Sequence, residues 1–189
     1  MLLWNQLKSH VATQPNKIAL TCESTSLTYS ELANQSEALA QSWLQSGLKP
    51  GDRIALHLRN GLDIARCYYA CFASGIIAVP INTRLTPEEI GYVLDHSGAK
   101  GYIASPDLRI ETSIPSFTAN AIGSSLATLL EPDPDAVAAL LYTSGTTARP
   151  KGAIHTQRTL VGNCKLMEDW GLRRDDHTLL TTPMVHITG

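Results

Sequence analysis

The sequence has few residues that could crosslink the chain. Its four cysteines are scattered over 189 residues, with no CxxC pair and no histidine at zinc-finger spacing. Cys67 and Cys71 lie four residues apart on an expected helix, a spacing that also suits two metal ligands on one face. Because no second pair accompanies them and reduced cysteine is common in protein cores, we expect both thiols to be buried and predict no metal-ligating residues. A reduced, cytoplasmic protein is the simplest interpretation.

Long apolar runs and an excess of one charge are also lacking. The first residues, MLLWNQLKSHV, are interrupted by polar side chains and are too short for a signal peptide, and no stretch approaches the length of a membrane span. The formal net charge is -2, with both signs interspersed, so no basic face for nucleic acid is indicated. We therefore expect one globular domain with no integral membrane segment and no nucleic-acid partner, and a small anionic ligand fits better.

Residues 1–104 alternate between helical and strand patterns. Two capping boxes predict helix starts, one formed by Thr28 with Glu31 and one by Thr86 with Glu89. Pro80 predicts that the end of its strand lies at a sheet edge or exit. In chain order we predict a helix before Pro15, a strand at 18–21, a helix from Thr28 to Gly47, a strand at 53–58, a helix at 62–74, a strand at 76–81, a helix from Thr86 to Gly98 and a strand at 101–104. This alternation is typical of βαβ units and predicts an α/β fold, with a layered, parallel-rich sheet covered by helices on both faces.

Residues 105–135 have the composition of a connector. They mix four prolines with small polar residues, which predicts turns and at most short strands. Glu131, Asp133 and Asp135 are interspersed with proline, and we interpret them as a solvated turn rather than a metal cluster. Residues 136–189 are predicted to form a strand ending near Tyr142, a strand at 152–155, a helix from Gln157 to about Trp170 with Leu160, Cys164 and Met167 facing inward, and a strand at 177–181.

The most informative stretch joins two of these strands and reads LLYTSGTTARPKGAI, from Leu140 to Ile154. Gly145 has no Cβ, so the main chain can approach an anion closely, and consecutive backbone N–H groups can form an anion nest. Lys151 adds a mobile positive charge that suits a terminal phosphate. The composition predicts a phosphate-binding loop whose candidate ligands are Thr143, Ser144, Gly145, Thr146, Thr147 and Lys151. An ordinary surface turn rich in serine and threonine is the alternative interpretation.

The loop differs from the Walker A motif of P-loop NTPases. Gly145 precedes Lys151 by the expected six positions, but Pro150 replaces the second glycine of that motif. Gly152 replaces its final serine or threonine. We therefore do not assign the chain to that class of enzyme.

The stretch YTSGTTARPKGA resembles the signature loop of the adenylate-forming superfamily, which includes acyl-CoA synthetases, the adenylation domains of peptide synthetases and firefly luciferase. The resemblance implies that the loop holds the outer phosphates of ATP while a carboxylate attacks the α-phosphorus, giving an acyl-adenylate and pyrophosphate. Ala148 stands where the superfamily usually has glycine. If the loop needs a positive φ at that position, alanine costs about 1 kcal/mol or more.

The segment PMVHITG resembles a second motif of the superfamily and favours the acyl-CoA synthetase branch over amino-acid-activating domains. In that branch the histidine of the motif, here His186, lies beside the acyl-substrate pocket. The residues alone leave open whether His186 packs between Val185 and Ile187 or lines a pocket, and the resemblance favours the pocket. Thr146 followed by Thr147 agrees with the same branch, because the amino-acid-activating branch tends to have serine and then threonine.

The resemblance spans essentially the whole chain, but the proteins of the superfamily are considerably longer. It implies that residues 1–189 are a partial N-terminal AMP-binding domain, made of α/β units at 1–104, a connector at 105–135, and the phosphate loop, a helix and the start of the acyl-pocket motif at 136–189. Catalytic residues and a C-terminal domain are expected beyond residue 189. The implied activity is that of an ATP-dependent carboxylate–CoA ligase that uses ATP, Mg²⁺ and CoA.

Two alternatives to this activity stay open. One is a non-catalytic nucleotide-binding or interaction module of the same fold, and the other is an amino-acid adenylation domain. The sequence does not identify the carboxylic acid, because most pocket-lining residues of the superfamily come later in the chain. We expect the isolated chain to be inactive and to self-associate through apolar surface that further residues would bury.

Overall fold

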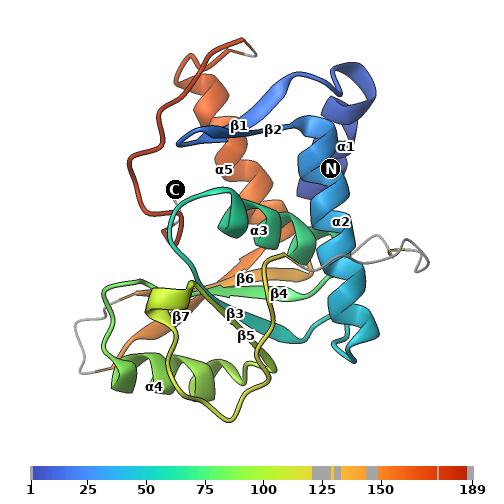
Figure 1. The fold of residues 1–189 in the computed structure, drawn as a ribbon. Coiled ribbons are helices and arrows are strands. Elements are labelled where there is room, and N and C mark those ends of the chain that lie inside the picture. The colour runs from blue at the N-terminus through green and yellow to red at the C-terminus, as the bar shows by residue number, and fades with distance from the viewer. Residues whose placement is uncertain (1, 121–128, 130–132, 144–148, 174, 187–189) are drawn as a thin grey trace.

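Helices and strands alternate along the computed structural model, which describes residues 2–120, 129, 133–143, 149–173 and 175–186 (Figure 1). The helices are α1 (Leu3–Thr13), α2 (Tyr29–Gln45), α3 (Leu62–Ser74), α4 (Pro87–Ser97) and α5 (Gln157–Asp169). The strands are β1 (Ile18–Cys22), β2 (Thr25–Thr28), β3 (Arg53–His57), β4 (Ile77–Pro80), β5 (Gly101–Ala104), β6 (Val137–Thr143) and β7 (Lys151–Thr156). A short 3-10 turn follows β5 at Pro106–Leu108.

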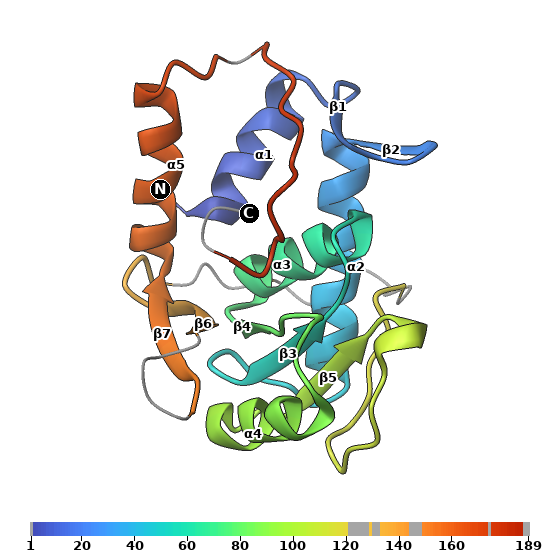
Figure 2. The same cartoon turned by 90° about the vertical axis from the view of Figure 1, so that its left-hand side faces the viewer.

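One mixed sheet organises these elements. Within the described residues it has five strands in the order β5-β3-β4-β6-β7, and β1 pairs with β2 in a separate hairpin. The strands β3, β4, β5 and β6 run parallel, whereas β7 pairs antiparallel with β6. One face of the sheet is covered by α4, and the other by α2, α3 and α5, with α1 packed on these helices on the side away from the sheet (Figures 1 and 2). The predicted α/β fold, with a parallel-rich sheet and helices on both faces, is confirmed.

Local capping signals set the positions of two helices. Thr28 Oγ1 accepts a hydrogen bond from Glu31 N at 3.2 Å, and Glu31 Oε2 accepts one from Thr28 N at 2.8 Å, so the first capping box is confirmed. Thr86 and Glu89 form the second box in the same way. Gly98, with a φ of 60°, ends α4 in the left-handed conformation that glycine adopts without strain. The start of α4 in turn sets the length of the loop that follows β4.

Apolar side chains fill both faces of the sheet. On one face, Ile90, Val93 and Leu94 of α4 pack against the strands. On the other face, Cys67 and Cys71 of α3 belong to a larger cluster shared by the helices of that layer. Burial raises the pKa of both thiols, so they stay protonated at neutral pH. The predicted core packing of the two cysteines is confirmed.

One predicted strand is wrong, and one observed strand was not predicted. The prediction that Pro80 marks an edge or an exit is confirmed as an exit, because Pro80 is the last residue of β4, a strand that lies between β3 and β6. Pro80 is tolerated there because its missing N–H falls at the last strand position, and Ile81 N donates to Leu56 O at 2.9 Å just beyond it. Residues 177–181, all within the described part, form no strand, and the side chain of Leu179 is 86% exposed. The short strand β2 was not predicted.

The inward face of α5 also differs from the prediction. Val161 is buried and Leu160 is half-buried, whereas Cys164 is exposed, so its predicted inward position is wrong. The buried face of the helix runs through Leu160 and Val161 because that side rests on α1 and the core. The side chain of Met167 lies outside the described part. No helix of the described residues has the length and apolar character needed to cross a bilayer.

Candidate functional site

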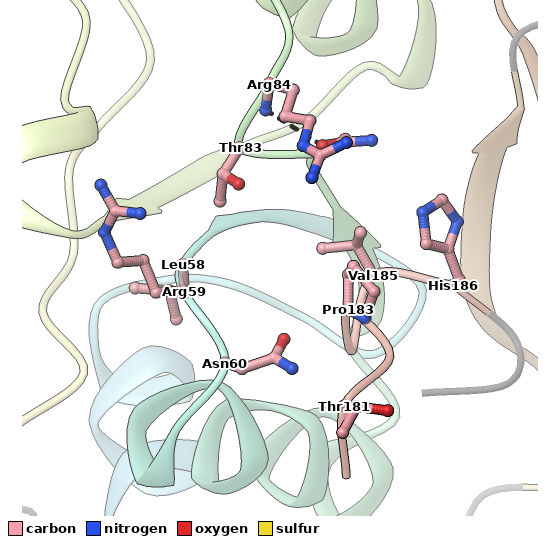
Figure 3. Close-up of a pocket in the computed structure, with 10 residues that line it drawn as sticks. Leu58, Arg59, Asn60, Thr83, Arg84, Thr181, Pro183, Val185 and His186 are labelled. Atoms are coloured by element: carbon pink, nitrogen blue, oxygen red, sulfur yellow. Dashed lines mark hydrogen bonds between the residues drawn. The ribbon is translucent and has the colours of Figure 1, made fainter.

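The carboxyl ends of the parallel strands meet at one edge of the sheet, where the following loops leave room for a ligand. A cavity of about 440 Å³ lies there (Figure 3). This volume is within the range of small-molecule sites, roughly 300–1,000 Å³. The loops after β3 and β4 supply part of its lining, namely Leu58, Arg59, Asn60, Asn82, Thr83 and Arg84. The cavity is the candidate ligand site in the described part of the chain.

The remaining wall comes from residues 175–186, an irregular segment after α5 that we call the strap. It runs from the far end of α5 down to the sheet (Figure 2). Asn60 Nδ2 donates to Thr182 O at 2.9 Å, and Asn60 Oδ1 accepts from Met184 N at 2.7 Å. The hydroxyl of Tyr68, on α3, donates to Met184 O at 2.6 Å. These bonds fasten the main chain of the strap to the loop after β3 and to α3.

Two residues near the end of the strap face different surroundings. Both line the cavity, but Val185 is buried against the core whereas His186 is exposed (Figure 3). His186 N donates to Pro183 O at 3.1 Å, which closes a turn at this point. The alternative of a histidine packed in the core does not fit this exposure. Contact between His186 and a substrate stays a prediction.

The candidate phosphate loop leaves the same edge of the sheet. Thr143, the last residue of β6, pairs with Lys151, the first residue of β7. Because β6 runs parallel to β4, this pair lies at the carboxyl edge, as does the cavity-lining loop after β4. Lys151 is exposed and accessible to an anion. The other predicted ligands, Ser144, Gly145, Thr146 and Thr147, lie outside the described residues together with Ala148.

The loop end of the β6–β7 hairpin contacts α4. The hydroxyl of Tyr142 lies 2.8 Å from His96 Nδ1, and the guanidinium carbon of Arg149 lies 5.4 Å from the centre of the Tyr92 ring. A Cβ at Gly152 would approach Tyr142 Cζ to 3.2 Å, so glycine leaves the space that the tyrosine ring occupies. A serine or threonine at position 152, as in the Walker A motif, would crowd the Tyr142 ring.

Two arginines without a predicted role line the cavity, and Arg84 adds positive charge to it because the charge of Arg59 is paired with a carboxylate. Arg59 forms an ion pair with Asp107, and the hydrogen bond from Arg59 lowers the pKa of that carboxyl group. Arg84 contributes a second guanidinium group to the lining (Figure 3). Each arginine follows the carboxyl end of a parallel strand, and that position is the signal by which a sequence reading could find them. The charge suits an anionic ligand.

His57 is the last residue of β3, and the cavity-lining residues of the following loop come directly after it. Its side chain is buried beneath the site. It is 2% exposed, and its Nδ1 lies 3.0 Å from the hydroxyl of Tyr102 on β5. Burial lowers the pKa of His57 and raises that of Tyr102. Both groups are therefore neutral at neutral pH, with one nitrogen–hydroxyl hydrogen bond between them.

The sequence of the chain matches a known family. Residues 7–189 match the sequence model described as AMP-binding enzyme. The chain belongs to the AMP-binding enzyme family. Sulfoacetate–CoA ligase of Cupriavidus necator is 33% identical to it over 183 residues, covering 86% of this chain and 36% of that protein. Fatty acid–[acyl-carrier-protein] ligase ScoC of Streptomyces coeruleorubidus is 32% identical over 200 residues, covering 95% of this chain and 38% of that protein.

A solved structure agrees with this AMP-binding fold. The o-succinylbenzoate coenzyme A synthetase MenE of Bacillus subtilis, in complex with ATP and a magnesium ion, superposes with a TM-score of 0.86 and 26% sequence identity. The match covers 100% of this chain and 53% of that chain. This member of the AMP-binding enzyme family spans less than two fifths of the length of the two ligases above, 36% and 38%.

Proposed function

We propose that this chain is the N-terminal part of an AMP-forming carboxylate–CoA ligase. The enzyme would activate a carboxylic acid with ATP to an acyl-adenylate and pyrophosphate, and then transfer the acyl group to the thiol of CoA. The observation that carries the proposal is that both ends of the candidate phosphate loop, Thr143 and Lys151, lie at the same sheet edge as the cavity lined by His186. Its relatives that are named as acid–thiol ligases support it.

The first step places negative charge on the leaving pyrophosphate. A carboxylate oxygen forms a bond to the α-phosphorus of ATP, and the bond from that phosphorus to the bridging oxygen of the β-phosphate breaks. Lys151 and the hydroxyl groups of Thr143, Ser144, Thr146 and Thr147 would bind the outer phosphates, with Gly145 allowing close approach of the main chain. Mg²⁺, when bound to the nucleotide, supplies further charge neutralisation. The contribution of the loop is electrostatic, because it stabilises charge that grows during the reaction.

The acyl group would occupy the cavity beside His186. The cavity volume of about 440 Å³ suits a small to medium-sized acid, and its wall is partly made by the strap. CoA is proposed as the thiol acceptor. One relative is named for a carrier protein as acceptor, so a carrier-protein thiol is the alternative that the assay must include.

Pyrophosphate exchange tests this function on the enzyme that contains this chain. We expect exchange of labelled pyrophosphate into ATP that depends on a carboxylic acid, followed by AMP release when CoA is added. In Lys151→Ala, loss of a charge-assisted contact worth about 1.5–3 kcal/mol should slow exchange by roughly tenfold or more. Lys49→Ala is the matched control, because Lys49 is an exposed lysine preceding β3, at the opposite edge of the sheet. Acid-independent hydrolysis to ADP, or equal rates in both variants, would contradict the proposal.

A further inference from the structure

The strap reaches the cavity without joining the sheet. Residues 175–186, all described, contain no strand, and so no ladder of backbone hydrogen bonds fixes their path. Their main chain is instead bound by side chains. The carboxamide of Asn60 bonds both to the oxygen of Thr182, at 2.9 Å, and to the nitrogen of Met184, at 2.7 Å. A carboxamide offers a donor and an acceptor side by side, so it pairs with main chain as a neighbouring strand would.

A third bond comes from α3. The Tyr68 hydroxyl donates to Met184 O at 2.6 Å, so both the N–H and the C=O of Met184 are held. The ring of Tyr68 stacks on Phe72, with centroids 6.1 Å apart and an interplanar angle of 17°. The position of Tyr68 is therefore fixed by α3 and by this stacking, independently of its bond to the strap. We call Asn60 and Tyr68 the clamp.

The bonds of the clamp lie directly before the residues that shape the cavity. Thr182 and Met184 flank Pro183, and Val185 and His186 follow within two positions. Val185 is 8% exposed, and its burial shows that the strap is seated on the core at this point. A displacement of Met184 would move both the buried anchor and the cavity-lining His186. The clamp therefore controls the shape of one wall of the cavity.

We propose that Asn60 and Tyr68 are positioning residues for acyl-substrate binding, which hold the main chain of Thr182–Met184 so that Val185 and His186 form the wall of the pocket. The proposal rests on the proposed function for the identity of the ligand as an acyl group. The physical part of it, that these two side chains fix the main chain of the strap, is independent of any activity.

Substitutions can separate the individual bonds. Tyr68→Phe removes only the hydroxyl bond and keeps the ring on Phe72. Asn60→Asp keeps the acceptor for Met184 N and loses the donor to Thr182 O, whereas Asn60→Ala loses both. Asn60 is exposed, so these variants should leave the core intact. Asn34→Ala is the matched control, because Asn34 is an exposed asparagine on α2.

Two measurements are made on the enzyme that contains this chain. Amide hydrogen exchange at Met184 should speed up about tenfold in Asn60→Ala and stay near the wild-type rate in Asn60→Asp and Asn34→Ala. Steady-state kinetics should show KM for the carboxylic acid raised about tenfold in Asn60→Ala and a few-fold in Asn60→Asp and Tyr68→Phe, with KM for ATP changed less than twofold. A raised KM for the carboxylic acid with a nearly unchanged KM for ATP is not expected from a general loss of structure.

The two measurements distinguish the ways in which the inference can fail. Unchanged exchange at Met184 in Asn60→Ala overturns the clamp, whatever the activity. Faster exchange with an unchanged KM for the acid, or with equal changes in KM for the acid and ATP, overturns the positioning role. If the wild-type enzyme activates no carboxylic acid, the proposed function fails and the acyl pocket with it, while the exchange data still decide whether the clamp holds the strap.

Discussion

The buried pair of His57 and Tyr102 predicts a pH dependence of stability with a defined sign. His57 is 2% exposed, and burial lowers its pKa more than the neighbouring Asp107 carboxylate raises it. In the unfolded chain the same imidazole titrates near pH 6.5. Below about pH 6.5 the unfolded state therefore binds a proton that the folded state resists. The contribution of His57 to stability is complete above this pH and is lost as the pH falls toward the folded-state pKa.

The size of the effect follows from linkage. One group that takes up a proton only on unfolding changes the free energy of unfolding by at most about 1.4 kcal/mol per pH unit. His57→Asn removes the titrating ring and keeps a polar atom near the position of Nδ1, which bonds to Tyr102. We expect this variant to be less stable at pH 7.5, by about 1–3 kcal/mol for an imperfectly replaced buried hydrogen bond. We also expect its stability to fall less steeply between pH 6.5 and 5.

Denaturation by urea at several pH values measures both quantities in the protein. His177→Asn is the matched control, because His177 is an exposed histidine. A His57→Asn variant with the same slope as the wild type would show that His57 has the same pKa in the folded and the unfolded state. The reasoning from burial would then be refuted.

Three further predictions concern the hairpin, the loop and the outer surface. Gly152→Ala should displace the ring of Tyr142, because the new Cβ would approach that ring to 3.2 Å, and should weaken the 2.8 Å contact between Tyr142 and His96. We expect the tyrosine fluorescence to change. Unchanged fluorescence together with an unchanged melting temperature would contradict the close packing. Ala148→Gly should change the free energy of unfolding by no more than about 1 kcal/mol and should alter ATP affinity, as measured by calorimetry. If the affinity does not change, the position does not require a positive φ. The isolated chain of 189 residues should self-associate, because large apolar residues such as Trp170, 75% exposed, and Leu179, 86% exposed, leave apolar surface in contact with water. Light scattering that shows a single monomeric species would contradict this expectation.

The helix starts and most of the strands were predictable because their signals are local. The capping box of Thr28 and Glu31 spans four residues, and so does that of Thr86 and Glu89. The position of β4 inside the sheet was not predictable from Pro80, since strand order depends on partners far away in the chain. The predicted strand at 177–181 is wrong, because local composition does not supply a neighbouring strand to pair with.

The candidate site was predictable only in part, for the same reason. The phosphate loop is a contiguous stretch, and its residue types alone indicate anion binding. The cavity is assembled from distant segments, and Asn60 meets Thr182 and Met184 across 122 and 124 positions of sequence. No periodicity or spacing reports such a contact, and for this reason the sequence predicts a role for His186 but not for Asn60.

The clamp has a consequence for how proteins built on this scaffold can diverge. The hydrogen bonds from Asn60 and Tyr68 go to main-chain atoms of Thr182 and Met184, and every amino acid carries those atoms, apart from the N–H that proline lacks. These bonds therefore do not constrain the exposed side chains of the strap, although Val185 is buried in the core. Exposed residues of the strap that line the cavity can be substituted, and the pocket changed, while the path of the backbone stays the same. Selectivity for a new acid can then evolve ahead of any change in architecture.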